Sequence, residues 1–176
     1  MYDDKNILIR KLKESDIPII VDAFNTANWP KPVSTFKTYF QEQQNGERLV
    51  WLAYLENQFA GYITLKWQSL YELFAKSHIP EIMDLNVLPT FRKQGIGSKL
   101  LEIAEKAAST KTNVVGIGVG LYGGADGGYG AAQKPYVNRR YIPDGNGVTY
   151  NYQPATPGEN FPIDDNLILW FTKKLK

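Results

Sequence analysis

Apolar and polar residues follow one another in blocks that predict an α/β fold. Short apolar runs bounded by turn residues indicate one strand over residues 7–13, two within 48–67, and one each over 81–89, 113–120 and 167–174. Apolar residues at helical spacing indicate helices over residues 15–25, 35–44 and 95–110. The second and third strands form a hairpin around Glu56 to Gln58. This order predicts a mixed α/β layer whose first half is antiparallel.

Two further segments are predicted to be irregular, one a helix that contains a proline and the other a turn. The stretch from Tyr129 to Tyr141 is expected to form a short helix that Pro135 interrupts, because proline removes a backbone hydrogen bond. The sequence "PDGNG" at 143–147 is expected to form a tight turn. At 176 residues the chain is predicted to be one domain over residues 1–176 with its own core.

Composition and charge exclude several classes of protein. The formal net charge is +2 with Lys and Arg scattered, so we expect neither a nucleic-acid partner nor an anionic membrane partner. The absence of Cys and the presence of one histidine, His78, argue against disulfides and a zinc centre, so we expect no bound metal. No apolar run approaches the ~20 residues of a membrane span, and the first residues lack a signal-peptide pattern. We therefore expect a cytoplasmic location.

Two glycines, Gly95 and Gly97, lie between a predicted strand and the clearest helix. Free N–H groups of residues 94–98 at the start of that helix would point together and favour an anion. The glycines lack the Cβ atoms that would hold phosphate oxygens away, and Arg92 and Lys93 add positive charge. Each hydrogen bond to a charged oxygen contributes about 1.5–3 kcal/mol. The alternative is that the glycines serve only close packing of helix on strand; the basic residues favour a pyrophosphate site.

A second glycine run places Gly118, Gly120 and Gly123 at the spacing G-x-G-x-x-G after a predicted strand. A dinucleotide fold needs a helix to begin inside this motif, and the sequence "LYGGADGGYG" has no helical period. The acidic residue expected about 20 positions later falls near Asp144, in the predicted turn. We expect a loop or a close backbone passage here. An NAD(P)-binding oxidoreductase is the weaker alternative.

The strand "EIMDLNVLP", the turn "TFRKQGIG" and the helix "SKLLEIAEKA" resemble the acyl-CoA-binding motif of the GNAT superfamily of N-acetyltransferases. Arg92, Gly95 and Gly97 match the family pattern Gln/Arg-x-x-Gly-x-Gly/Ala, and Val87 to Pro89 match Val-x-Pro. The resemblance implies the GNAT fold, a mixed, mostly antiparallel central sheet with splayed central strands and helices on both faces. It also implies acetyl-CoA, or coenzyme A after transfer, as the co-substrate.

The resemblance assigns coenzyme A to the backbone of this segment. Amides of residues 94–98 would bind the pyrophosphate, and main-chain groups near the strand end would bind pantetheine and the acetyl carbonyl. Strand 113–120 would splay from strand 81–89, and its glycine-rich end would leave room for a substrate. The cofactor-binding residues implied are Leu85, Val87, Arg92, Lys93, Gln94, Gly95, Ile96, Gly97 and Ser98.

Acetylation of an amine needs a base, because an alkylamine has a pKa near ~10.4 and is almost entirely protonated at neutral pH. A carboxylate in a dry site would accept that proton. Glu81 is our first candidate, because it falls where related histone acetyltransferases keep a basic glutamate, and Asp84 is the second. The two point to opposite faces of a regular strand, and one bulge would change that. The alternative for Glu81 is a solvated charge at a strand edge.

The coenzyme A thiolate that leaves would benefit from a proton donor, a role that the resemblance gives to Tyr136. The family pattern around it, Asn-x-x-Ala-x-x-Leu-Tyr-x-x-x-Gly-Phe, is met at Tyr136 and departs at Tyr129, Pro135 and Arg140. The position of Tyr136 is therefore open, and a packing role with a satisfied hydroxyl is the alternative.

The acceptor is expected between the sequence "NWPKP", the glycine-rich loop and the tail around "PIDDN". Trp29 is a candidate wall of that pocket, and Asp164 or Asp165 a candidate attractor of a cationic amine, although loop packing and a solvated turn are plain alternatives.

The sequence thus predicts transfer of acetyl from acetyl-CoA directly to a primary amine of a small-molecule or peptide acceptor. An acyl-CoA-binding module without catalysis is the alternative. Neither a monomer nor a homodimer is excluded.

Overall fold

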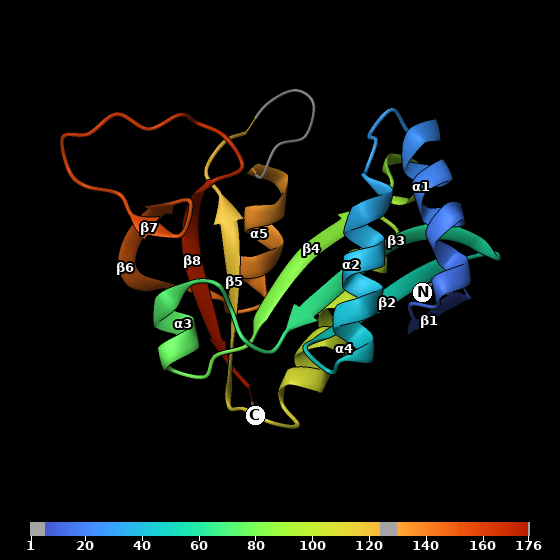
Figure 1. The fold of residues 1–176 in the computed structure, drawn as a ribbon, viewed down its shortest axis with the longest axis horizontal. Helices are drawn as coiled ribbons and strands as arrows, with labels where there is room; N and C mark the ends of the chain where they lie inside the picture. Colours follow the sequence, from blue (N-terminus) through green and yellow to red (C-terminus); the bar gives the residue numbers. More distant parts are fainter. Residues whose placement is uncertain (1–5, 124–129, 176) are drawn as a thin grey trace. The chain divides into compact units, whose positions relative to one another are not determined.

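The computed structural model describes residues 6–123 and 130–175. Those residues form a mixed sheet of eight strands, hydrogen-bonded in the order β1-β2-β3-β4-β5-β8-β6-β7, and five α-helices (Figure 1). The predicted α/β class with a mixed sheet is confirmed. The chain divides into two compact units, the first from Met1–Lys66 and Met83–Lys106, and the second from Trp67–Ile82 and Ala107–Lys176.

Antiparallel strands form the sheet of the first unit. The register pairs Ile9 of β1 with Ala53 of β2, and Ala53 with Gly61 of β3. Glu56 and Asn57 both have a positive φ, of 50° and 63°, which a tight two-residue hairpin turn requires. The predicted hairpin is therefore confirmed. The strands are β1 (Ile7–Lys11), β2 (Arg48–Leu55), β3 (Gln58–Lys66) and β4 (Glu81–Val87), of which Met83 onward belongs to this unit.

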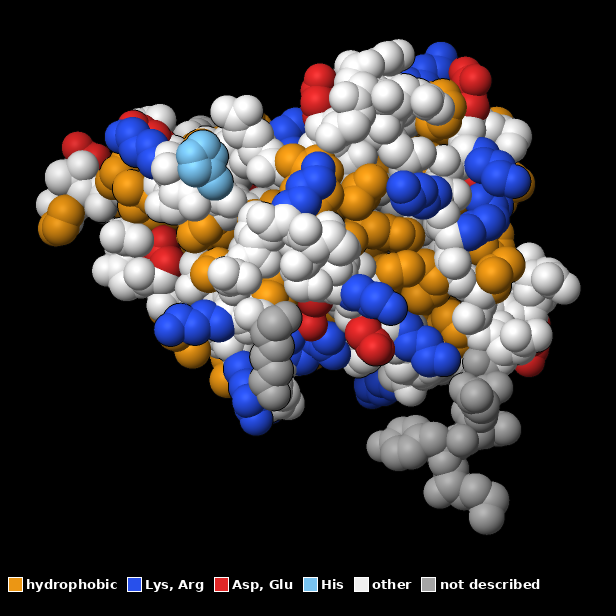
Figure 2. All heavy atoms as spheres, turned by 90° about the horizontal axis from the view of Figure 1, so that it is seen from below, with side chains coloured by type: hydrophobic (Ala, Val, Ile, Leu, Met, Phe, Trp, Pro, Cys, Tyr) orange, Lys and Arg blue, Asp and Glu red, His pale blue; other side chains and the backbone are white. Residues whose placement is uncertain are grey.

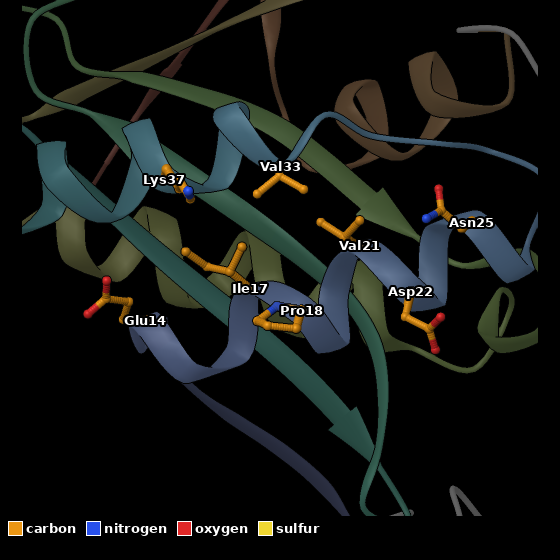
Figure 3. A pocket seen from close by; sticks show the side chains of 8 residues that line it. All are labelled: Glu14, Ile17, Pro18, Val21, Asp22, Asn25, Val33 and Lys37. Carbon is orange, nitrogen blue, oxygen red and sulfur yellow. The ribbon is translucent and has the colours of Figure 1, made fainter.

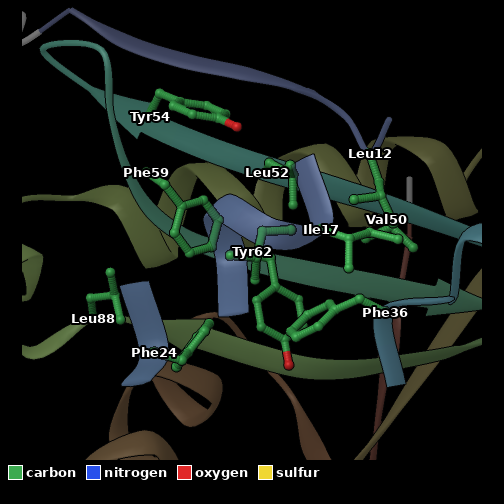
Figure 4. Close-up of a cluster of buried hydrophobic side chains, with 11 residues drawn as sticks. Leu12, Ile17, Phe24, Phe36, Val50, Leu52, Tyr54, Phe59, Tyr62 and Leu88 are labelled. Carbon is green, nitrogen blue, oxygen red and sulfur yellow. The ribbon is translucent and has the colours of Figure 1, made fainter. Parts of the chain in front are cut away.

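Helices of the first unit bury aromatic rings against these strands. Phe24 of α1 and Phe36 of α2 are fully buried, and their rings meet that of Tyr62 from β3 at centroid distances of 5.8 and 5.4 Å. Figure 4 shows the three rings in one cluster with Leu52. Burial of each such side chain stabilises the fold by about 1.5–3 kcal/mol. The helical elements are η1 (Glu14–Asp16), α1 (Ile17–Thr26), α2 (Val33–Gln44), η2 (Pro89–Phe91) and α4 (Ile96–Ala108).

Strand β5 organises the second unit. It pairs in parallel with the start of β4, through Glu81 with Gly116, and antiparallel with β8 along its whole length. Strand β8 also pairs antiparallel with β6, which pairs with the short β7. The predicted strands at 113–120 and 167–174 are confirmed. The bounds are β5 (Val114–Gly120), β6 (Ile142–Tyr150), β7 (Gln153–Pro154) and β8 (Leu167–Lys174).

The prediction of a tight turn at "PDGNG" is wrong, because the segment lies inside β6. Turn chemistry is nevertheless present: the Asp144 carboxylate accepts the amide of Asn146 at 2.9 Å, and Gly145 has a φ of +86°. The result is a shift of the β6–β8 register between Pro143 and Val148. Pairing with β8 on both sides keeps the strand continuous through the irregularity.

Two short helices complete the second unit. Helix α5 (Gly130–Asn138) contains Pro135, as predicted. Helix α3 (Glu72–Lys76) lies between two predicted strands, in a segment for which no element was predicted. Its buried ring, Phe74, packs edge-on against Trp170 of β8 at 5.3 Å, and the neighbouring Tyr71 stacks on Trp170 at 4.2 Å. Contacts with a strand far along the chain therefore support this single turn.

Candidate active site

The loop between β4 and α4 has the backbone of an anion-binding cradle. Lys93 and Gly95 have φ values of +59° and +83°, and α4 begins at Ile96. At the start of this helix, the amide of Lys99 donates a hydrogen bond to the Gly95 carbonyl at 3.1 Å. The amides that precede it lie ahead of the helical ladder and have no acceptor within it. This arrangement of left-handed residues and N–H groups outside the helical ladder suits an anion.

Arg92 links this loop to the end of β4. Its Nε donates to the Val87 carbonyl at 3.1 Å, and its guanidinium carbon lies 5.8 Å from the centre of the Trp29 ring. This hydrogen bond uses one of the five N–H donors of the guanidinium. Because the side chain is exposed, other donors can reach a ligand. The Val87 carbonyl, predicted to meet pantetheine, is therefore a partner of Arg92 in this structure.

Gly95 and Gly97 differ in what surrounds them. No heavy atom lies within 4 Å of the position that a Cβ of Gly95 would take, so the space beside the cradle is open. A Cβ of Gly97 would make ordinary contact with Val87 at 3.9 Å. Gly95 thus fits the predicted close approach of phosphate oxygens, and Gly97 lies against the strand end.

Strand β4 is bulged at Asp84, whose φ is +54°. The amide of the Asn86 side chain donates to the Asp84 carbonyl at 3.0 Å and supports the irregular backbone. A left-handed non-glycine residue breaks the alternation of side chains along a strand. The alternation that would place Glu81 and Asp84 on opposite faces of a regular strand is therefore interrupted at Asp84.

Gly61 of β3 accommodates the bulged strand. A methyl group there would overlap the carbonyl oxygen of Asn86, so only glycine admits the backbone of β4 at this point. The sequence carried a signal for this, since an isolated glycine inside a strand often marks a bulge or a close backbone approach.

The Asp84 carboxylate is about one-third exposed and is held from α2. The hydroxyl of Tyr39 donates to its Oδ2 at 2.6 Å, and Nη1 of Arg48 lies 4.0 Å from the same oxygen. Burial and the neighbouring carboxylate raise the pKa of Tyr39 well above its usual value, so this phenol stays protonated as a donor. Sequence reasoning missed Tyr39 and Arg48, because their sequence neighbourhoods carry no motif.

The Glu81 carboxylate is buried, with 3% of the residue exposed, in contrast to the solvated alternative. The hydroxyl of Ser69 donates to its Oε2 at 2.6 Å, and Ser69 also accepts the amide of Tyr71 at 3.0 Å. Both partners belong to the second unit. Glu81 therefore lies in the dry surroundings that we required of a base, with a hydrogen-bonded serine that sequence reasoning missed.

Tyr136 is also buried, with 7% of the residue exposed. Its ring meets that of Tyr141 edge-on at 5.9 Å, and burial raises its pKa to about 12. The phenol is therefore neutral and able to donate at any physiological pH. Pro135 is tolerated inside α5, and the Tyr141 amide closes the helix end on the Tyr136 carbonyl at 3.0 Å.

The candidate acceptor residues have structural partners. Trp29 packs edge-on against Phe24 at 5.3 Å, beside the Lys31 ammonium. Asp164 accepts the Tyr150 hydroxyl at 2.9 Å, and Asp165 accepts the Tyr122 hydroxyl at 2.6 Å. Residues 124–129 of the glycine-rich loop, including Tyr129 of the motif comparison, lie outside the described residues.

The glycines of β5 contradict the expectation of room for a substrate. A Cβ at Gly116 would overlap the ring of Phe74, and one at Gly118 would lie 2.9 Å from Trp170. The space is filled by the aromatic rings of α3 and β8, so these two glycines serve packing. No helix begins within residues 118–123, as a dinucleotide motif would need.

Two open cavities in the first unit lie apart from the candidate carboxylates. One, of about 450 Å³, is lined by α1 and α2, with Ile17, Val21 and Val33 along its wall and Asp22 and Lys37 at its rim (Figure 3). The other, of about 650 Å³, includes Pro89 to Phe91 just before the cradle. His78, the pale-blue side chain in Figure 2, is exposed at the surface.

A model of the acetyltransferase (GNAT) family matches residues 17–120. The match covers more than half of the chain and contains β4, the cradle and α4. The chain therefore belongs to the GNAT family of acetyltransferases, enzymes that take the acetyl group from acetyl-CoA.

Solved structures share the fold at low sequence identity. The N-acetyltransferase from Staphylococcus aureus Mu50 is 18% identical with a TM-score of 0.70, covering 97% of this chain and 99% of that one. The ribosomal-protein-S18-alanine N-acetyltransferase from Escherichia coli is 16% identical with a TM-score of 0.66, covering 96% and 94%. A putative acetyltransferase from Salmonella typhimurium, solved with its cofactor acetyl-CoA, is 14% identical with a TM-score of 0.67, covering 97% and 94%.

At these identities the likeness shows the fold alone. No curated protein matches the sequence significantly. Within residues 6–123 and 130–175, no helix is both long enough and apolar enough to cross a membrane.

Proposed function

We propose that the chain is a single cytoplasmic GNAT domain over residues 1–176 that transfers acetyl from acetyl-CoA to a primary amine. The cradle carries this proposal: two left-handed residues, Lys93 and Gly95, precede a helix whose first amides have no acceptor within it. The open space beside Gly95 suits phosphate oxygens. Amides of residues 94–98 would hold the pyrophosphate, with Arg92 and Lys93 at its rim, and main-chain groups of Leu85 and Val87 the arm.

In the proposed reaction the amine attacks the thioester directly, and a carboxylate takes its proton. Glu81 is the proposed base, supported by its burial and by the hydrogen bond that the Ser69 hydroxyl donates to its Oε2. Because Glu81 is 3% exposed, we expect a water molecule to relay the proton. Asp84 is the second carboxylate of the same strand.

Tyr136 is the proposed proton donor to the coenzyme A thiolate. Its pKa of about 12 keeps the phenol neutral, so the proton is present when the thiolate leaves. The low polarity around the ring strengthens a hydrogen bond to a sulfur anion.

A thiol-release assay with acetyl-CoA tests the proposal. The acceptor panel should contain spermidine, lysine amide and the dipeptide amide Ala-Ala-NH2, which represent polyamines, lysines and protein N-termini. We expect release with at least one of them, and a loss of about 10²-fold or more in kcat for Glu81→Gln, as for removal of a general base. For Tyr136→Phe we expect a smaller loss in kcat.

Two control variants make the same substitutions, glutamate to glutamine and tyrosine to phenylalanine, at positions outside the proposed mechanism. Glu72→Gln alters an exposed glutamate paired with Lys76, and Tyr54→Phe alters a buried tyrosine whose hydroxyl meets Asp16 and Arg10. Both should retain full turnover. Unchanged turnover in Glu81→Gln and Tyr136→Phe would remove these residues from the mechanism, whereas tight acetyl-CoA binding without release for any amine would favour a binding module.

A further inference from the structure

The ring of Tyr39 contacts two aromatic rings and a guanidinium group. Its ring meets Phe36 at a centroid distance of 6.1 Å and Tyr62 at 6.5 Å, and the Arg48 guanidinium lies 4.5 Å from the ring centre. The hydroxyl is then directed at Oδ2 of Asp84, 2.6 Å away. A ring packed in this way holds a carboxylate with little loss of entropy when a ligand binds.

Arg48 fixes the ring and is itself fixed. Its side chain is 5% exposed; Nε donates to Glu42, and Nη1 donates to Thr64 at 2.7 Å. Glu42 also accepts the Lys66 ammonium at 2.6 Å. Because Glu42 engages the arginine directly, Arg48 approaches Asp84 only to 4.0 Å and leaves its carboxylate without a bidentate ion pair.

Asp84 therefore has one oxygen engaged and one available. Tyr39 and Arg48 both address Oδ2, and the side chain is 34% exposed. Within residues 6–123 and 130–175, no hydrogen bond to Oδ1 is present in the structure. The bulge at φ +54° presents this oxygen from a backbone conformation that a regular strand would not give.

We propose that Tyr39 is a positioning residue for the acceptor amine: it holds Oδ2 of Asp84 so that Oδ1 accepts a hydrogen bond from the amine nitrogen. This inference rests on the proposed acetyl transfer and assigns the acceptor side of that site. The acceptor class is a primary alkylamine, whose nitrogen supplies the N–H donor that the carboxylate needs.

Binding to the unreactive complex with coenzyme A tests this role without turnover. Spermidine, lysine amide and Ala-Ala-NH2 are each titrated by calorimetry into protein saturated with coenzyme A. We expect at least one to bind. Tyr39→Phe should weaken it about three- to tenfold, the loss of one hydrogen bond, and Asp84→Asn by more.

The matched control is Tyr54→Phe, whose hydroxyl also meets an aspartate and an arginine, Asp16 and Arg10, at 3.4 and 2.9 Å. It should leave amine binding within about twofold of wild type, because the hydroxyl that it removes contacts Asp16 and Arg10 and not Asp84. In the thiol-release assay, Tyr39→Phe should raise KM for the amine and leave KM for acetyl-CoA unchanged. A merely structural tyrosine would alter both.

The outcomes separate this inference from the proposed function. Thiol release by wild type together with unchanged amine binding in Tyr39→Phe would overturn the role of Tyr39 and leave acetyl transfer standing. Amine binding that depends on Tyr39 and Asp84, with no thiol release, would overturn the proposed reaction and retain the amine site. No binding by any of the three amines would overturn the site itself.

Discussion

At residue 95 the backbone has a φ of +83°, which costs an L-residue about 1–2 kcal/mol relative to glycine. Gly95→Ala should therefore lower the free energy of unfolding by that amount. Because the strain distorts amides that we expect to bind pyrophosphate, loss of one hydrogen bond to a charged oxygen should weaken coenzyme A binding about tenfold or more. Chemical denaturation and calorimetry measure the two effects.

Gly46 provides the control for this prediction. It has a φ of +77°, and no atom lies within 4 Å of its absent Cβ, so Gly46→Ala imposes the same backbone strain. It lies after α2 and far along the chain from the cradle. The two variants should lose similar stability, and only Gly95→Ala should lose coenzyme A affinity. Equal affinities would argue against the cradle.

Residues of the candidate site fall into two groups, those whose interaction partners are close in the sequence and those whose partners are distant in the sequence. Arg92, Gly95 and Gly97 were predictable, because a helix start and its preceding strand are encoded in one short segment. Tyr39 was not, since the hydrogen bond that defines its role joins residues 45 positions apart. Ser69 and Glu81 are 12 positions apart and share no motif.

Helix α3 packs on strand β5 because Gly116 has no side chain and leaves space for the ring of Phe74. Gly116→Ala would push into the buried ring of Phe74, and overpacking of this kind costs about 1–3 kcal/mol. Denaturant unfolding should show this loss of stability. In a Phe74→Leu background the same substitution should cost less, because the shorter side chain leaves space. Additive effects of the two changes would contradict the contact.

The same contact explains why the element was not predicted. A five-residue helix has too little local stability to be recognised, and what supports α3 is the stack of Tyr71 and Phe74 with Trp170. In β6 the local signal was correct, since Gly145 and Gly147 have positive φ, but pairing with β8 decided the element.

Several tyrosines tie the stability of the molecule to alkaline pH. Burial raises the pKa of Tyr136 to about 12, and burial together with the Asp84 carboxylate also raises the pKa values of Tyr39 and Tyr62 well above the usual value of 10.0. The folded state keeps these protons after the unfolded state has lost them. Stability is therefore fully present below about pH 10, and falls as pH rises toward the folded pKa, by up to about 1.4 kcal/mol per pH unit for each tyrosine.

Denaturant unfolding at pH 9, 10 and 11 measures this dependence. Tyr136→Phe removes one titrating group, so its stability should decline less steeply above pH 10 than that of wild type. Tyr39→Phe should behave in the same way. Parallel declines in all three proteins would show that these phenols do not differ between the folded and unfolded states.

At the scale of the whole chain, the order of the long elements was predictable and their partners were not. Strands β1 to β5 and β8 and helices α1, α2 and α4 follow hydrophobic periodicity, which depends on burial of one face. The sequence left open whether strand β4 is regular, and the left-handed backbone of its central residue, Asp84, is set by contacts with α2 and β3.

Gly61 makes that bulge predictable from the amino-acid sequence. In an unbroken pair of strands many side chains would fit at this position, whereas here the Asn86 carbonyl occupies the space. A substitution at 61 would be tolerated only together with a change in the course of β4. Gly61 therefore indicates the backbone course of β4. In a related sequence, a lone glycine within the strand ahead of the motif would predict a bulged neighbouring strand from the sequence alone.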